Sequence, residues 1–277
     1  MLGGSIGLAV RARIDGAKVV GFGHRKETLD KALDCGAIDE SYTDPKQAVR
    51  GCDLIVLCTP VGLLEKMIDG MASALEPGAI VTDVGSTKRS IVAAAEKKLP
   101  PTVHFVGSHP MAGSEKRGVE FARTDLFDHA TCILTPTEKT DIAALKQVEQ
   151  FWTALGMKTA RLSPIEHDRY LADVSHLPHV VAGALVAMQQ EQALALSGKG
   201  FMDTTRIAGG DGAIWRDILI DNADNMRTAI TKLTEQLTML QSLLFPEKAD
   251  ELEKWLNASS RRREQLHQAR LREMNAD

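Results

Sequence analysis

The sequence has no excess of basic residues and no long apolar run, and each absence excludes a class of protein. Its 277 residues carry 33 Lys and Arg against 37 Asp and Glu, a formal net charge of -4. A nucleic-acid-binding protein needs a basic surface to meet phosphates, so we expect no nucleic-acid partner. No apolar run reaches the length of a membrane span and no signal peptide is visible, so we expect no membrane partner.

Cysteine is also scarce. The four cysteines, Cys35, Cys52, Cys58 and Cys132, form no Cys-x-x-Cys pair and have no histidine partners at metal-ligand spacing. Cys58 and Cys132 lie in apolar, strand-like runs, where a thiol behaves as a small hydrophobic group. This usage is typical of a reducing compartment, so we expect a cytoplasmic protein that binds no metal.

The order of apolar runs predicts two domains. Up to residue 162, short strands alternate with helical spacers, which predicts an α/β, Rossmann-like, doubly wound parallel sheet. From Ser163-Pro164, a typical helix start, no convincing strand follows. We expect a dinucleotide-binding domain over 1–162 and an all-helical substrate-binding and dimerisation domain over 163–277. Apolar residues recur at three- and four-residue steps from Met226 to Leu244, which favours a homodimer.

The chain begins with part of a dinucleotide-binding fingerprint. Gly3, Gly4 and Ser5 run directly into a helix, and Gly3 takes the place of the third glycine in a Gly-x-Gly-x-x-Gly turn. The first strand and the first two glycines are apparently missing. We expect these three residues to contact a bound dinucleotide, and restoring an upstream strand to raise cofactor affinity.

Two strand ends predict the rest of the cofactor site. The strand over 18–23 ends at His24 and Arg25, with no acidic residue to bind ribose hydroxyls. Arg25 could instead meet a 2′-phosphate, which slightly favours NADP over NAD, although these residues also fit an exposed basic loop. The strand over 53–58 ends at Thr59 and Pro60, where backbone amides could meet the cofactor.

Two further strands end at the predicted active site. The strand at 81–83 is followed by Ser86, and a strand that ends at Val106 is followed by His109. Ligands of open α/β sheets lie beyond the carboxyl ends of the strands, so we interpret His109 as the chemical centre. A satisfied structural histidine is the alternative. Glu115 follows in a polar loop and lies near His109 if that loop folds back.

The helical half contributes two polar clusters. Ser175 and His179 are four residues apart, and therefore share a helical face if the helix continues past Pro178. A glycine-rich segment after Arg206, closed by Trp215, suits an anionic ligand held by a guanidinium. The alternatives are a salt bridge from Arg206 to Asp203 or Asp211 and core packing of Trp215.

Together these segments resemble the prephenate/arogenate dehydrogenase family of tyrosine biosynthesis. The match covers most of the chain and is carried by these motifs: Leu2-Gly3-Gly4-Ser5, Asp83-Val84-Gly85-Ser86-Thr87-Lys88, Gly107-Ser108-His109-Pro110-Met111-Ala112-Gly113-Ser114-Glu115, Ser175-His176-Leu177-Pro178-His179 and Asp203-Thr204-Thr205-Arg206-Ile207-Ala208. Each motif alone is weak, and their combination in this order is specific.

The resemblance implies oxidative decarboxylation of a small-molecule cyclohexadienol, with hydride transfer to NAD or NADP. It implies that neutral His109 accepts the proton of the ring 4-hydroxyl, while Ser86 bridges that hydroxyl, the imidazole and the nicotinamide. Arg206 would bind a substrate carboxylate, and Ser175, His179 and Glu115 would complete or gate the pocket.

Several alternatives remain open at this stage. Prephenate and arogenate differ only in the side chain, and both carry the carboxylate that Arg206 would bind. A β-hydroxyacid dehydrogenase shares the architecture but typically uses a lysine base in its helical domain. A module that binds the cofactor without turnover is a third possibility, because the glycine-rich turn is incomplete.

Overall fold

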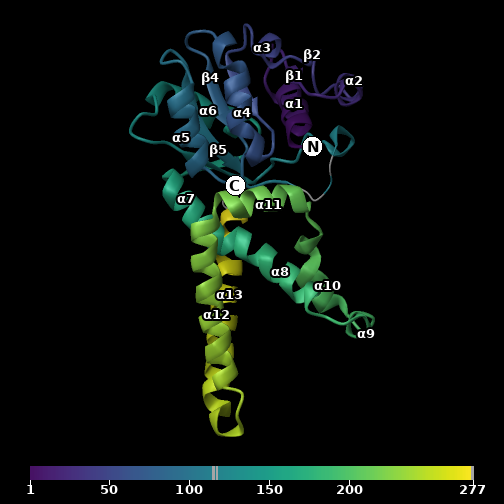
Figure 1. Ribbon diagram of the computed structural model, residues 1–277, viewed down its shortest axis with the longest axis vertical. Helices are drawn as coiled ribbons and strands as arrows, with labels where there is room; N and C mark the ends of the chain where they lie inside the picture. Colours follow the sequence, from purple (N-terminus) through teal and green to yellow (C-terminus); the bar gives the residue numbers. More distant parts are fainter. Residues whose placement is uncertain (114–115, 117, 276–277) are drawn as a thin grey trace. The chain divides into compact units, whose positions relative to one another are not determined.

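The computed structural model of the protein describes residues 1–113, 116 and 118–275 (Figure 1). Strands and helices alternate in the first part of the chain. They are α1 (Leu2–Arg13), β1 (Val20–Phe22), α2 (Lys26–Asp34), β2 (Glu40–Tyr42), α3 (Pro45–Ala48), β3 (Leu54–Leu57), α4 (Val61–Met71), β4 (Ile80–Asp83), α5 (Arg89–Lys98), β5 (His104–Pro110), β6 (Thr131–Thr135), α6 (Ile142–Ala154) and β7 (Lys158–Arg161).

The strands form two sheets. β1 pairs with β2, and a five-stranded sheet has the order β3-β4-β5-β6-β7. No ladder joins β1 to β3 within the described part of the chain. All pairs are parallel except β5 with β6, so the predicted Rossmann-like fold is confirmed with one antiparallel pair.

Helices cover both faces of the five-stranded sheet, because side chains alternate across each strand. On β4, Ile80 packs into one core with α1 and α6, around the fully buried Trp152. The next residue, Val81, packs into a second core with α4 and α5. Figure 1 shows α4 and α5 lying together on one side of the strands. The doubly wound arrangement therefore follows from the two-residue period of the strands.

The prediction that a strand ends at Val106 is wrong. β5 continues to Pro110, because residues 107–110 form an antiparallel ladder with β6 after Val106 has paired with β4. His109 consequently lies inside a strand, opposite Ile133, and not in a loop beyond the sheet. The small and polar residues after Val106 marked a change of pairing partner, which a single strand pattern does not reveal.

After residue 162 every described element is helical. They are α7 (Pro164–Leu171), a π-helical turn (Ala172–His176), α8 (Leu177–Ala187), α9 (Glu191–Leu194), α10 (Lys199–Thr205), a 3-10 turn (Arg206–Gly209), α11 (Gly212–Asp221), α12 (Ala223–Ser242), a second 3-10 turn (Pro246–Lys248) and α13 (Ala249–Asn275). Ser163 and Glu166 form a capping box at the start of α7. Pro178 lies in the first turn of α8, so the helix avoids a break by changing to π geometry just before it.

The chain forms two compact units, Met1–Asn225 and Met226–Asp277. The change from sheet to helices at residue 163 therefore falls within the first unit. The second unit contains most of α12 and all of α13. Along α12 the apolar side chains of Ile230 and Leu237 are exposed, at 42% and 55%. None of the described helices is long and apolar enough to span a membrane.

Candidate active site

His109 is buried in β5 and is uncharged near neutral pH. Its side chain is 8% exposed, and its Nδ1 lies 2.9 Å from Nε2 of His167. Burial lowers the pKa of His109 well below its usual value of 6.5, and the nearby His167, Lys88 and His176 lower it further. A neutral imidazole can accept a proton, so His109 has the protonation state that a general base requires.

His167 and Asp168 connect His109 to the start of α5. Nδ1 of His167 lies 2.8 Å from Oδ1 of Asp168. The Asp168 carboxylate also accepts the backbone N–H groups of Lys88 and Arg89, at 2.7 and 2.9 Å. All of these side-chain atoms are buried or nearly so. No sequence pattern points to His167 and Asp168, since adjacent polar residues within a helix give no signal of contact with a strand 58 residues away.

The loop that carries Ser86 is held by a buried ion pair. Nζ of Lys88 contacts Oδ2 of Asp83, and both side chains are fully buried. Lys88 Nζ also donates to the backbone oxygen of Ser108 at 2.9 Å, while Asp83 accepts the N–H of Gly85 at 2.8 Å. These bonds tie β4, β5 and the intervening turn together. Lys88 is thus a fixed structural cation, and the side chain left half-buried in this turn is Ser86.

A cavity of about 500 Å³ lies between the sheet and the helices of the first compact unit. Its lining includes most of the predicted site: Leu2, Thr59, Pro60 and Ser86 from the nucleotide-binding half, and Arg206 and Trp215 from the helical half. Among the described residues His109 does not line this cavity. The structure therefore brings Ser86 and Arg206 to one cavity and keeps the imidazole buried in the strand.

Arg206 and Trp215 occupy the helical side of this cavity. The Arg206 side chain is exposed, and no salt bridge joins it to Asp203 or Asp211 within the described ranges. Asp211 instead caps α11 by accepting the N–H groups of Ala213 and Ile214 at 2.9 and 3.0 Å. The guanidinium therefore remains available for an anionic ligand.

Trp215 stacks on His179, with ring centroids 3.5 Å apart and planes 10° apart. Burial lowers the pKa of His179, and a hydrogen bond to the backbone of Ile207 partly opposes that shift. A Cβ at Gly210 would lie 2.5 Å from Nε1 of Trp215, so this glycine lets the loop pack directly on the stacked rings. The interpretation of Trp215 as isolated core packing is thus replaced by a ring pair beside the cavity.

Two of the predicted substrate residues that the structure describes, Ser175 and His179, do not line the cavity. Ser175 is half-buried in the π-helical turn and does not line this cavity among the described residues. Its neighbour His176 is the inward side chain, only 1% exposed, and the pKa of His176 is lowered to about 4, chiefly by burial. Glu115 lies outside the described residues.

The first turn of α1 adjoins the cavity through Leu2. A Cβ at Gly3 would lie 3.3 Å from Cβ of Cys58, and one at Gly4 would lie 2.9 Å from Val119. Both glycines therefore allow close packing of the helix start. Ser5 is fully buried, and its hydroxyl accepts the N–H of Arg123 at 3.0 Å.

His24 and Arg25 are exposed where β1 ends, immediately before α2. His24 packs edge-on against Phe22, with ring centroids 5.3 Å apart. This placement fits both an exposed basic loop and the ribose end of a cofactor site.

The residues around the cavity fit a dinucleotide. The first N–H groups of α1 lack partners in their own helix, and a helix N-terminus favours a pyrophosphate. Thr59 supplies a second observation, because its buried Oγ1 has no hydrogen-bond partner although the residue lines the cavity. The cofactor would be held by Thr59, Pro60 and the start of α1. Its nicotinamide ring would accept the hydride.

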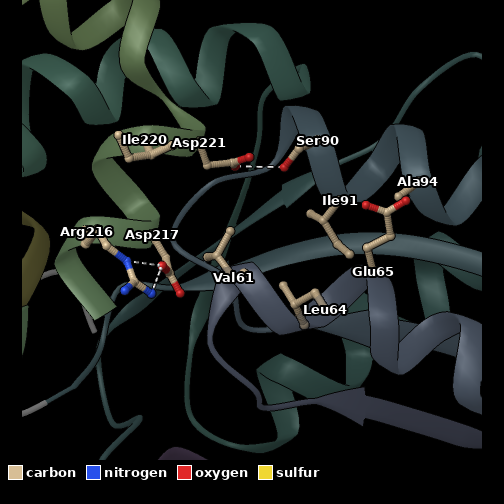
Figure 2. Close-up of a pocket in the computed structure, with 11 residues that line it drawn as sticks. Val61, Leu64, Glu65, Ser90, Ile91, Ala94, Arg216, Asp217, Ile220 and Asp221 are labelled. Carbon is tan, nitrogen blue, oxygen red and sulfur yellow. Dashed lines mark hydrogen bonds and ion pairs between the residues drawn. The ribbon is translucent and has the colours of Figure 1, made fainter. Parts of the chain in front are cut away.

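A second cavity of about 410 Å³ lies among α4, α5 and α11 (Figure 2). Across it Ser90 donates to Asp221 at 2.7 Å, and Figure 2 shows these two side chains pointing toward one another. Nearby, Arg89 makes two 2.8 Å bonds to Asp224. These contacts join α5 to the helical half. The described residues contain no group of three His, Cys, Asp or Glu side chains arranged to bind a metal.

The buried imidazoles predict an acid-sensitive fold. Burial is the main cause that lowers the pKa values of His109, His167 and His176 in the folded protein. As pH falls below about 6.5, these histidines become protonated in the unfolded chain but stay neutral in the folded protein. The free energy of unfolding therefore falls by up to about 1.4 kcal/mol per pH unit for each histidine. Urea unfolding at pH 7 and pH 5 checks this. The exposed His24, changed to Gln, should leave the difference unchanged, and equal stability at both pH values would contradict the prediction.

In this structure a doubly wound sheet and a helical half meet at a cavity. A helix N-terminus lies on one side of the cavity and a guanidinium on the other, and this architecture is typical of a nicotinamide-dependent dehydrogenase. Residues 6–161 match the family model of the prephenate dehydrogenase nucleotide-binding domain. Residues 163–258 match that of the prephenate dehydrogenase dimerization domain. The chain therefore belongs to the prephenate dehydrogenase family.

Individual relatives agree with this assignment. The prephenate dehydrogenase of Bacillus subtilis (strain 168) is 33% identical over 273 residues, which are 96% of this chain and 74% of that protein. A crystal structure of prephenate dehydrogenase from A. aeolicus in complex with hydroxyphenyl propionate and NAD+ has a TM-score of 0.89 at 36% identity, covering 96% of this chain and 94% of that one. The structure of Synechocystis arogenate dehydrogenase has a TM-score of 0.80 at 31% identity and covers 96% of both chains.

Proposed function

We propose that this protein oxidatively decarboxylates prephenate to 4-hydroxyphenylpyruvate and transfers the hydride to NAD or NADP. The observation that carries the proposal is the cavity that Ser86 and Arg206 line from opposite halves, in a protein whose buried imidazole is uncharged. Relatives named prephenate dehydrogenase and cyclohexadienyl dehydrogenase support the substrate class.

The chemistry is divided between the residues that line the cavity and His109, which lies behind its wall in β5. His109 accepts the proton of the substrate 4-hydroxyl as carbonyl character develops at that carbon. Ser86 orients the hydroxyl from its rigid turn, and Arg206 binds a substrate carboxylate. Loss of hydride and CO2 makes the ring aromatic, so the protein's main contribution is to position the reacting atoms. Glu115 and Ser175 remain proposed pocket residues, with the stacked His179 and Trp215 beside the carboxylate.

The test of this function is direct. Purified protein is mixed with prephenate and either NAD or NADP, and the absorbance of reduced nicotinamide is followed together with the release of 4-hydroxyphenylpyruvate. Absence of both products with both cofactors would reject the proposal and favour a module that binds the cofactor without turnover. Initial rates measured with prephenate and with arogenate show which of the two substrates is preferred. Arogenate is included because the chain is similar to an arogenate dehydrogenase.

The cofactor preference is tested at Arg25. A guanidinium at the end of β1 favours a 2′-phosphate, and the absence of an acidic residue there removes repulsion against NADP. The comparison structure with NAD+ supports NAD for that relative. The ratio of the two cofactor dissociation constants in the wild type and in Arg25→Gln measures the contribution of this residue.

Replacing Arg206 with Gln is expected to raise KM for prephenate about 10- to 100-fold with little change in kcat. A charge-assisted hydrogen bond to a bound carboxylate contributes about 1.5–3 kcal/mol, and it is present in both substrate and transition state. Arg216, which pairs with Asp217 at 2.6 Å, provides the matched control, since Arg216→Gln leaves the cavity intact. An unchanged KM in Arg206→Gln would remove this residue from the site.

The domain plan is also a proposal. A division between residues 162 and 163 is supported by the two family models, which meet between 161 and 163. A homodimer through the helical domain is supported by the dimerization-domain match and by the exposed apolar side chains Leu237 and Leu244. Light scattering of the wild type and of Leu237→Glu tests it, and a wild-type monomer at micromolar concentration would reject it.

A further inference from the structure

Resting on the proposed function, we propose that His167 and Asp168 are positioning residues that fix the tautomer of His109 and leave its Nε2 as the base. The three side chains form one hydrogen-bonded line from α7 to β5. Nδ1 of His109 meets Nε2 of His167 at 2.9 Å, and Nδ1 of His167 meets Oδ1 of Asp168 at 2.8 Å. His167 is fully buried and Asp168 is 1% exposed, so water does not compete along the line.

The direction of the protons follows from the backbone at the start of α5. Asp168 accepts the N–H of Lys88 at Oδ1 and that of Arg89 at Oδ2, at 2.7 and 2.9 Å. Backbone N–H groups only donate, so they fix both carboxylate oxygens as acceptors. Burial alone would raise the pKa of Asp168, but the bonds from His167 and from these two N–H groups bring it below its usual value. The positive end of the α5 dipole favours the same ionised form.

With the carboxylate of Asp168 ionised, only one tautomer of each imidazole allows both hydrogen bonds of the line, from His109 to His167 and from His167 to Asp168. The N–H of His167 must be at Nδ1, because a lone pair there would face the anionic oxygen of Asp168. Nε2 of His167 is then an acceptor, and Nδ1–H of His109 must donate to it. The lone pair of His109 is consequently at Nε2, the nitrogen free to take the substrate proton. The order of donors is therefore imposed by the helical half.

The surroundings of His109 do not supply another way to fix this tautomer. The titratable groups that face it are His167, Lys88 and His176, and Lys88 is bound to Asp83. Nδ1 of His176 lies 3.3 Å from Nδ2 of Asn222 and does not bond to His109 among the described contacts. Asn222 also donates to the backbone oxygen of Asp168 at 2.7 Å, which holds this end of the line in place.

The tautomer is measured in the intact wild-type protein by 15N NMR with labelled histidine. We expect His109 and His167 each to be protonated at Nδ1 and unprotonated at Nε2 at pH 7.5, and loss of the corresponding signals in His109→Asn and His167→Gln assigns them. A proton on Nε2 of His109, or a doubly protonated His167, would overturn the inference. Because this readout needs no turnover, it stands apart from the prephenate assay, whose failure would reject the proposed function alone.

Kinetics of two matched variants test whether the tautomer matters to the reaction. His167→Gln keeps an amide oxygen that can accept the His109 Nδ1–H, whereas His167→Leu has no acceptor. We expect kcat to fall about 100-fold in the Leu variant and about tenfold or less in the Gln variant, with unchanged cofactor dissociation constants. Equal kcat values in the two variants, at comparable thermal unfolding midpoints, would show that His167 only fills space.

Asp168→Asn reverses the line without changing its shape. If the amide nitrogen faces His167, Nδ1 of that ring becomes an acceptor and Nε2–H donates to His109, which moves the His109 proton to Nε2. Each orientation sets the amide nitrogen against one backbone N–H, that of Lys88 in the first and that of Arg89 in the second, so the reversed orientation competes with the original one. We expect kcat to fall about 100-fold with an unchanged KM for prephenate. A wild-type kcat, or a His109 15N signature that stays at Nδ1–H, would overturn the inference.

Discussion

Replacing His109 with Asn is expected to lower kcat about 1,000-fold while the cofactor dissociation constant stays within about twofold. A positioned general base contributes about 10²- to 10⁴-fold, and the amide of Asn cannot take up the substrate proton. The smaller Asn side chain lies in β5 behind the cavity wall, so the cofactor-binding residues keep their places. Stopped-flow turnover with prephenate and titration of nicotinamide fluorescence measure the two quantities.

His104 provides the control for this change. It lies in the same strand, five residues earlier, where it pairs with Ile80 of β4. His104→Asn is expected to keep wild-type kcat, since this residue is outside the cavity and outside the hydrogen-bonded line to Asp168. If His109→Asn turned over at more than about one tenth of the wild-type rate, His109 would not be the base, and the reaction would need a different proton acceptor.

Replacing Lys88 with Met is expected to destabilise the protein by about 3–5 kcal/mol. The change leaves the carboxylate of Asp83 without its ammonium partner at a site with no exposed surface, and an unpaired buried charge is costly. The free energy of unfolding of natural domains is only about 5–15 kcal/mol, so the variant loses a large part of its stability. Urea unfolding at pH 7.5 measures the loss.

Lys98 is the matched surface lysine. Its Nζ bridges Glu65 and Asp69 at 2.8 and 2.6 Å, and both carboxylates are more than half exposed. Lys98→Met should cost less than about 1 kcal/mol, because water screens such pairs. A similar small cost for Lys88→Met would mean that Asp83 is protonated or hydrated in the folded protein. The buried pair would then contribute little to holding the Ser86 turn.

The candidate active site combines a strand and turn with side chains from the helical half. Lys88, Asp83 and Ser108 tie the turn that carries Ser86 to the sheet, and Asp168 of α7 binds the start of α5. The two halves are thus joined at the point where the proposed base is oriented. A change in the helical half can therefore alter proton transfer in the nucleotide-binding half without touching the substrate.

Much of the fold could be predicted because it depends on local patterns. The alternation of strands and helices up to β7 and the Ser163-Pro164 helix start are set by hydrophobic periodicity and capping. The short strand β2 has no recognisable pattern, because three residues over 40–42 are too few to show a period. The end of β5 was misplaced, because its last four residues pair with a strand that lies more than twenty residues further along the chain.

The sequence alone determined the family, the Rossmann-like plan, the helical second half and the candidate residues His109, Ser86 and Arg206, because each rests on a local motif or a period. Only the tertiary structure decided that Ser5 is buried against a loop, that Lys88 is bound to Asp83, and that His167 and Asp168 stand behind His109. Those facts depend on hydrogen bonds between segments far apart in the chain. Such contacts exist only once the sheet and the helices have packed, and no local pattern encodes them.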